Sequence, residues 1–195
     1  DGIQHTGDEN GMARHFANVL FNTMRGGIYN DNYNINGRFF AQHVKHFNRK
    51  IGEQHNEFLL SIPDITDYRA LEKLIQNQND NNLYRLFQEY LPLTFSRRHG
   101  DPSRPWNLFN INIRDEAGNQ LLSYQGNWRD IFQNWEALSI SYPLYINGII
   151  SKFLNATTAD GYNPYRVTNE GIDWEVIEPD NPWSNIGYWG DHQII

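Results

Sequence analysis

The sequence of 195 residues contains no cysteine and no long apolar run. Without cysteine there are no disulfides, no thiolate nucleophiles and no zinc sites built on thiolates. The absence does not identify the cellular compartment of the protein, for which the cytoplasm is slightly favoured. No stretch of about 18 apolar residues is present, so no membrane-spanning helix is expected. The first residues, Asp1-Gly2-Ile3, show neither the basic nor the apolar region of a signal peptide. We therefore expect no membrane partner.

Positive charge is also scarce. Lys and Arg together number 16 against 23 Asp and Glu, which gives a net charge of −7 and an isoelectric point near 5.4. An acidic protein does not attract a phosphate backbone, so nucleic acid is not an expected partner. The patterns GxxxxGK[ST], GxGxxG after a strand and GxSxG are missing too. The sequence therefore does not support a nucleotide site, a dinucleotide site or the nucleophile elbow of an α/β-hydrolase.

Aromatic residues are abundant and stand among polar ones. Six Trp, eleven Tyr and eleven Phe make up 14% of the chain, while the mean hydropathy is −0.70. The apolar faces of a sugar ring stack on aromatic rings, and its hydroxyls pair with amides, carboxylates and guanidinium groups. This composition favours a sugar-binding surface. The alternative is that the aromatic residues fill the core and that the many Asn residues reflect the base composition of the genome.

Helical periodicity dominates the first half of the chain. The pattern predicts a helix over 11–25, a long helix from Asn36 or Gly37 to Leu60, and two shorter helices over 67–78 and 82–91. The segment 94–107 holds three Arg, two Pro and a Gly, which indicates an irregular loop. The expected buried stripe of the long helix consists of Phe39, Phe40, His43, Phe47, Ile51, His55, Phe58 and Leu59.

One β-hairpin and a pair of helices are predicted in the second half. The segments 108–114 and 120–125 alternate in polarity on either side of turn residues at 116–119. A helix over 128–140 and a second one from Pro143 to Asn155 are close enough in sequence to form a helical hairpin.

The carboxyl-terminal end of the chain has two notable features. Residues 157–182 are aromatic, acidic and Gly-containing, the kind of long loop usually kept for function. A last helix is expected from Pro182 or Trp183, and the chain stops within it at Ile195. Because the chain also begins without Met, we expect residues 1–195 to be a single incomplete helical domain excised from a larger catalytic domain.

The predicted helix over 128–140 has two distinct stripes. A polar row could face a cavity and bind a ligand, or it could be an ordinary solvated face. The polar stripe contains Arg129, Gln133 and Glu136, and the apolar stripe contains Ile131, Trp135 and Leu138.

Motifs between residues 126 and 189 add a family resemblance. GNWRDIFQNWEAL, a helix begun by Pro143, DGYNPYR and EPDNPWSNIGYW follow one another there. This order resembles the six-hairpin glycosidase superfamily, most nearly the cellobiose phosphorylase group. The resemblance implies a mainly α fold, part of an (α/α)6 barrel or six-hairpin toroid, whose inner helices and loops form a carbohydrate pocket. The matching positions are Trp128, Arg129, Asp130, Gln133, Asp160, Gly161, Asp180, Pro182 and Trp183.

The chain departs from that group at three points. Asn134 and Asn181 stand where the group has acids, so amides would make contacts that carboxylates make there. The Asp-Trp-Asn-Asp motif that bears the group's general acid is missing. Asp173-Trp174-Glu175 is the most similar segment, but it precedes the DNPW element instead of following it. The sequence therefore leaves open whether the general acid lies within this chain or beyond it.

Two further clusters contain residue types that bind ligands. Arg97, Arg98 and Arg104 could hold phosphate or a carboxylated sugar, or could form salt bridges with this acidic chain. His43 and His46 stand three residues apart, but no acid completes a convincing metal-ligand set, so no metal is expected.

Together these features predict a carbohydrate-active enzyme fragment that cleaves a glycosidic bond by hydrolysis or phosphorolysis. Its partners would be an oligosaccharide or disaccharide substrate and the rest of the parent chain, and inorganic phosphate would be the co-substrate of a phosphorolysis. The alternatives are a non-catalytic helical protein that binds a glycan or a subunit, and a helical scaffold without a ligand. The candidate catalytic residues are Asp173 and Glu175, and the candidate substrate-binding residues are Trp128, Arg129, Asp130, Gln133, Trp174, Asp180, Trp183 and Trp189.

Overall fold

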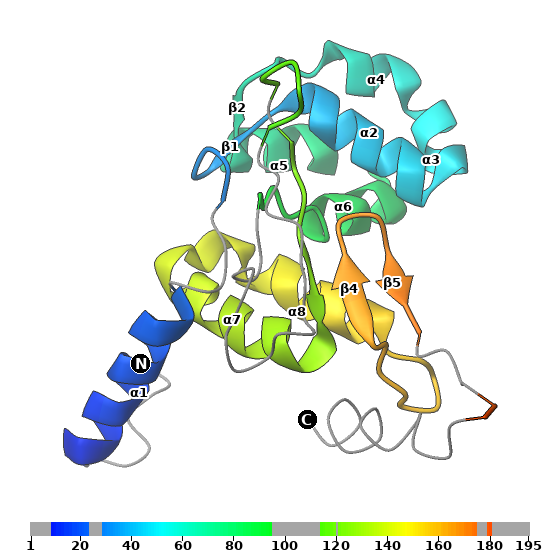
Figure 1. Cartoon of the computed structure of the whole chain (residues 1–195). Coiled ribbons are helices and arrows are strands. Elements are labelled where there is room, and N and C mark those ends of the chain that lie inside the picture. The colour runs from blue at the N-terminus through cyan, green and yellow to red at the C-terminus, as the bar shows by residue number, and fades with distance from the viewer. Residues whose placement is uncertain (1–8, 24–28, 95–113, 120, 175–178, 181–195) are drawn as a thin grey trace.

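A computed structural model describes residues 9–23, 29–94, 114–119, 121–174 and 179–180 (Figure 1). Within them the fold is mainly helical, with two small antiparallel sheets, which confirms the predicted mainly α class. The arrangement as part of an (α/α)6 barrel stays a prediction. In this described part of the chain, no helix is long and apolar enough to cross a membrane.

Six helices and one short sheet make up the first half of the described chain. The first helix, α1, packs on a later helix, α7. The short strands β1 and β2 pair antiparallel and hold the segment before α2 against the segment before α5. The elements are α1 (Glu9–Thr23), β1 (Asn34–Ile35), α2 (Gly37–Phe47), α3 (Arg49–Gln54), α4 (Asn56–Ser61), β2 (Thr66–Asp67), α5 (Tyr68–Gln76) and α6 (Asn81–Gln88).

The prediction of one long helix to Leu60 was wrong, because the chain turns twice within it. Asn48 adopts an extended conformation (φ −150°, ψ 93°) and ends α2, and its side chain then accepts a hydrogen bond from the Ile51 amide to cap α3. His55 forms the second break, between α3 and α4. An Asn side chain competes with the helical backbone for hydrogen bonds, which explains the break at Asn48. The result is that Ile51 and Leu59 both reach the core.

The helices α5 and α6 begin at aspartate caps. The Asp67 carboxylate accepts from the amides of the first turn of α5, and Asp80 does the same for α6. Their apolar faces then enter one core: Leu71, Ile75, Leu83, Leu86 and Phe87 are all at most 1% exposed.

A helical hairpin forms the centre of the second half, as the sequence predicts. It consists of α7 (Trp128–Ser141), a 3-10 turn η1 (Pro143–Tyr145) and α8 (Ile146–Ala156). The Trp128 ring meets the Phe153 ring edge-on with centroids 4.7 Å apart. Because this contact joins the start of α7 to the last turns of α8, the two helices run antiparallel.

The second sheet differs from the predicted hairpin. Its strands β3 (Gln125–Asn127), β4 (Arg166–Thr168) and β5 (Ile172–Asp173) pair in that order, all antiparallel. The turn at 115–119 is confirmed, with Gly118 at φ 83°, but residues 121–124 form no strand and 108–113 lie outside the described residues. The long loop expected at 157–182 instead contains the β4–β5 hairpin. Thr168 closes the turn of that hairpin by accepting from the amides of Glu170 and Gly171.

Candidate functional site

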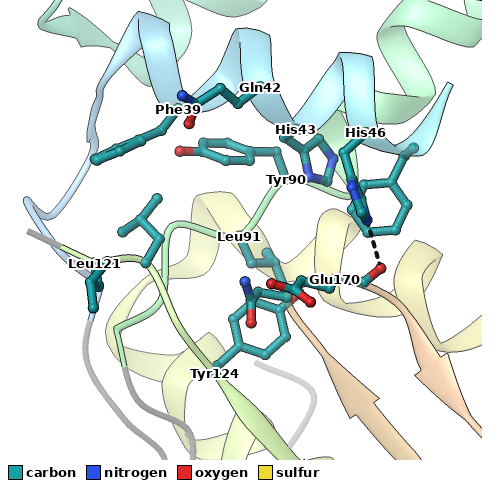
Figure 2. Close-up of a pocket in the computed structure, with 12 residues that line it drawn as sticks. Phe39, Gln42, His43, His46, Tyr90, Leu91, Leu121, Tyr124 and Glu170 are labelled. Atoms are coloured by element: carbon teal, nitrogen blue, oxygen red, sulfur yellow. Dashed lines mark hydrogen bonds between the residues drawn. The ribbon is translucent and has the colours of Figure 1, made fainter. Parts of the chain in front are cut away.

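Two adjoining pockets lie between α2 and the β4–β5 hairpin. The aromatic pocket, drawn in Figure 2, has a volume of about 310 Å³ and the polar pocket about 570 Å³. They share His46, Tyr124, Asn169 and Glu170, so they lie side by side, and the two together are called the cleft. The aromatic pocket is also lined by Phe39, Gln42, His43, Phe47, Tyr90, Leu91, Leu121 and Leu122, and the polar pocket by Ser123, Gln125, Arg166, Thr168, Gly171, Ile172 and Asp173.

One face of α2 supplies the upper wall of the aromatic pocket (Figure 2). Phe39, Gln42, His43 and His46 stand at i, i+3, i+4 and i+7, the spacing that places side chains in one row along a helix. The row consists of one apolar ring, Phe39, followed by three planar polar groups. Asn36 caps the helix by accepting from the Arg38 and Phe39 amides, which fixes where this row begins.

Tyr90 follows α6 and lies beneath this row. Its side chain is 4% exposed, and its ring meets Phe40 and His43 edge-on at centroid distances of 5.5 and 5.1 Å. Within the described residues its hydroxyl has no hydrogen-bond partner. Figure 2 shows this hydroxyl directed toward Phe39 and Gln42, and its oxygen is buried in the wall of the pocket. Burial raises the Tyr90 pKa above its ordinary value, so the phenol keeps its proton and is a donor.

His43 is neutral in this environment. Burial lowers its pKa to about 3, and the positive charge of Lys152 acts in the same direction. The ring Nε2 lies 3.2 Å from the Leu86 carbonyl oxygen. Because a carbonyl only accepts, the proton of the neutral ring sits on Nε2, and Nδ1 is left as an acceptor.

A hydrogen bond crosses the cleft at the shared boundary of the two pockets. His46 Nε2 donates to the Glu170 carbonyl oxygen at 2.9 Å, which ties α2 to the turn of the β4–β5 hairpin (Figure 2). The position of the hairpin, and with it the width of the cleft, therefore depends on a contact between segments far apart in the sequence.

The polar pocket contains one predicted catalytic residue, Asp173. Arg166 donates to Asp173 Oδ2 from Nε at 2.7 Å and lies in an ion pair with it through Nη2 at 2.5 Å. Both contacts fall on Oδ2, so the arginine holds that oxygen. Trp174 follows directly and is 43% exposed, but it is not a lining residue of either pocket.

The other predicted site residues are placed as follows. Trp128 is 4% exposed and packs on Phe153, so it belongs to the core and not to the cleft wall. Asp180 is exposed. Arg129, Asp130 and Gln133 lie on α7, but their side chains, like residues Glu175, Trp183 and Trp189 and the arginines of 94–107, lie outside what the structure describes.

The described side chains of α7 support its division into an apolar and a polar stripe. Its apolar stripe, Ile131, Trp135 and Leu138, is at most 2% exposed, whereas Glu136 of the polar stripe is exposed. The helix therefore presents one face to the core and Glu136 to the surface.

Sequence reasoning did not single out Gln42, Tyr90, Tyr124 or Glu170. The α2 row carried a signal, because planar polar groups interrupt an otherwise aromatic helix face. The two tyrosines carried none, since only tertiary packing brings Tyr90 and Tyr124 to the same pocket. Among the residues that the structure describes, no group of three or more His, Asp or Glu could hold a metal ion, and the histidines of α2 contact backbone carbonyls.

A comparison with models of protein families gives a match to part of the chain. Residues 29–92 match the family model described as glycoside hydrolase family 149 insertion domain 1. The match covers well under half of the chain, and a comparison with curated proteins gave no match. It supports a glycosidase-related protein in the context of a carbohydrate-active enzyme. The matched residues include β1 to α6, so they lie outside the motifs at 126–189 that carry the six-hairpin resemblance.

Proposed function

We propose that the chain is part of an enzyme that cleaves a glycosidic bond by hydrolysis or phosphorolysis, and that the cleft below α2 holds a glycosyl unit of its oligosaccharide or disaccharide substrate. One observation carries the second half of this proposal. The unit that matches a glycoside hydrolase insertion domain forms one wall of a cleft lined by both aromatic rings and planar polar groups.

The dimensions and chemistry of the cleft suit a sugar. Small-molecule sites usually have volumes of roughly 300 to 1,000 Å³, and the two pockets have volumes of about 310 and 570 Å³. Phe39 and Phe47, which are partly exposed, offer ring surface for the apolar side of a pyranose. The amides of Gln42 and Asn169 can both donate to and accept from hydroxyls.

The resemblance to the six-hairpin superfamily supplies the catalytic part of the proposal. Arg129, Asp130 and Gln133 would bind sugar hydroxyls from an inner helix of an (α/α)6 barrel, with Trp174, Trp183 and Trp189 as stacking walls and Asp180 as a further ligand. A carboxylic acid must protonate the leaving oxygen. Asp173 or Glu175 would take that role, unless the acid lies in another part of the parent chain. In a phosphorolysis, inorganic phosphate would attack from the opposite side.

Substitution of the α7 residues tests this assignment in the intact parent enzyme. A hydrogen bond to a charged group contributes about 1.5 to 3 kcal/mol, so Arg129→Ala should lower kcat/KM by about 10- to 100-fold, and Asp130→Asn should act in the same direction. Arg114→Ala is the matched control, because Arg114 is exposed and, within the described part of the chain, its guanidinium donates to the Gly118 carbonyl of its own turn. Unchanged kcat/KM in both α7 variants on every cleaved glycoside would exclude them as sugar ligands.

The acid is tested separately through the pH profile of kcat/KM. If Glu175 donates the proton, Glu175→Gln abolishes the limb of the profile that reports the acid, and Asp173→Asn leaves it. The converse result assigns the role to Asp173. Full activity with a normal profile in both variants places the acid outside this chain.

A non-catalytic glycan-binding role is the second candidate. The ion pair of Asp173 with Arg166 favours it, because the one described candidate acid is already engaged. A binding module would retain affinity for a glycan and show no turnover in the intact parent.

A further inference from the structure

Tyr90 places a buried donor in the aromatic pocket without giving it a partner. The buried Tyr145, by contrast, donates its hydroxyl proton to the Asn32 carbonyl oxygen at 3.1 Å. The Tyr90 hydroxyl has no such acceptor among the described residues, although its side chain is 4% exposed. A buried polar group without a partner costs free energy, which a ligand acceptor would recover.

The acidic side chains near this hydroxyl belong to two pockets. Glu170 lines the aromatic pocket, and Asp31 and Asp64 line a third pocket of about 220 Å³ that shares Phe39 and Tyr90 with it, with Asp64 paired to Arg38. His43 is uncharged, as shown above. Of the remaining described lining residues of the aromatic pocket, only His46 can carry a positive charge.

The nearest strong cations are already engaged. The Lys152 ammonium lies 5.3 Å from the Phe47 ring centroid and 5.5 Å from that of Tyr124, and Lys152 is not a lining residue. In the adjoining polar pocket, the Arg166 guanidinium is paired with Asp173. An anionic ligand in the aromatic pocket would therefore lose its hydration, meet Glu170, and find no free guanidinium or ammonium among the described lining residues.

We propose that the aromatic pocket selects an uncharged glycosyl unit over a uronate or a sugar phosphate, and that the Tyr90 hydroxyl is the specificity-determining donor. This inference rests on the proposed function, in which a sugar occupies the cleft. A ring hydroxyl accepts from Tyr90, and neighbouring hydroxyls donate to His43 Nδ1 and exchange hydrogen bonds with the Gln42 amide. The carboxylate of Glu170 accepts from a hydroxyl of a neutral sugar and repels a second carboxylate.

The test is a binding titration of the full chain by NMR. The probes are the methyl α- and β-glycosides of glucose, galactose and mannose, the matching hexuronic acids, and glucose 6-phosphate. We expect at least one neutral glycoside to bind, with its acidic counterparts at least about tenfold weaker. Tyr90→Phe should weaken neutral binding about tenfold. The variant should keep its melting temperature, because the hydroxyl it loses has no described protein partner.

Tyr29→Phe is the matched control. The Tyr29 hydroxyl is also buried and without a described partner, but Tyr29 lines none of the three pockets. It should leave binding unchanged. If no probe binds, the sugar cleft of the proposed function fails, and this inference fails with it. If a neutral glycoside binds but its uronate binds as tightly, or Tyr90→Phe binds like the wild type, the sugar cleft stands and the specificity inference is wrong.

Discussion

Lys152 shows how a single residue joins the two halves of the molecule. It projects from α8 and is 8% exposed, with its ammonium over the rings of Phe47 from α2 and Tyr124 from the segment before β3. Burial lowers its pKa to about 8, and the nearby charge of Glu89 only partly opposes this effect. The folded protein therefore keeps this lysine charged at neutral pH at a cost in stability, offset in part by its contacts with the two rings.

The first prediction concerns the pH dependence of stability. Between about pH 8 and the ordinary lysine pKa of 10.5, the unfolded chain binds a proton at Lys152 that the folded chain has released. The contribution of Lys152 to the free energy of unfolding should therefore rise with pH in this window, by about 2 kcal/mol between pH 7 and pH 10. From about pH 9 the tyrosines oppose this rise and above pH 10 they reverse it, because burial raises the pKa of Tyr90, Tyr124 and Tyr145, and the folded state then holds the extra protons.

Urea unfolding from pH 7 to 11 measures this profile. Lys152→Met keeps an apolar stem of similar length and cannot titrate, so its profile should lack the rise between pH 8 and 10. A wild-type profile that is flat in that window would show that Lys152 is not desolvated in solution.

At the scale of secondary structure, the approach of α6 and α8 depends on one glycine. A Cβ built on Gly148 would collide with the carbonyl oxygen of Gln88 at the end of α6 and would lie 3.4 Å from Leu91 Cδ2. The obstacle is mostly backbone, which cannot rotate away as a flexible side chain can. This contact sets the distance between α8 and the segment that carries Tyr90.

The second prediction follows from that contact. Gly148→Ala should lower the free energy of unfolding by about 1 to 3 kcal/mol, the usual cost of overpacking, although alanine is the better helix former. Asn147→Ala, at an exposed neighbour on the same helix, should change it by less than about 0.5 kcal/mol. Equal stabilities of wild type and Gly148→Ala in urea unfolding would mean that the helices can separate without cost.

The elements that the sequence predicts well are those governed by local interactions. The starts of α5 and α6 follow from Asp67 and Asp80, whose caps involve only the next few residues. The break at Asn48 was missed because periodicity continues across it. The pairing of β3 with β4 was missed because it joins residues about forty positions apart through three-residue strands, and no local pattern specifies such a partner. The same distinction holds for the site. Asp173 stands in a local sequence motif and was predicted as a site residue, whereas Tyr90 reaches the pocket only through tertiary packing and was not.

On the scale of the whole molecule, one core runs through both halves. The Tyr29 and Tyr145 rings stack with centroids 4.1 Å apart, and Tyr68 meets Tyr145 edge-on at 5.1 Å. These contacts join the unit that matches the insertion-domain model to the turn between α7 and α8. A separately folding domain would not place so much of its aromatic surface in such a contact.

The last prediction is that residues 29–94 do not form a stable domain alone. Without η1 and α8, the rings of Tyr29 and Tyr68 and the end of α6 lose the surfaces that cover them. In a unit of this size, 1 kcal/mol corresponds to about 4 to 8 °C in melting temperature, so the loss of a few such contacts should lower it by more than about 10 °C relative to the full chain. Circular dichroism melts combined with binding of the dye ANS measure both the shift and the newly exposed apolar surface.

Mixing the unit with residues 114–195 is the control and should restore the melting temperature in part. Recovery would show that the lost contacts with η1 and α8, and not damage at the new chain ends, caused the drop. An isolated unit that melts like the full chain and binds no dye would identify residues 29–94 as an autonomous domain, and would contradict the single-domain prediction for residues 1–195.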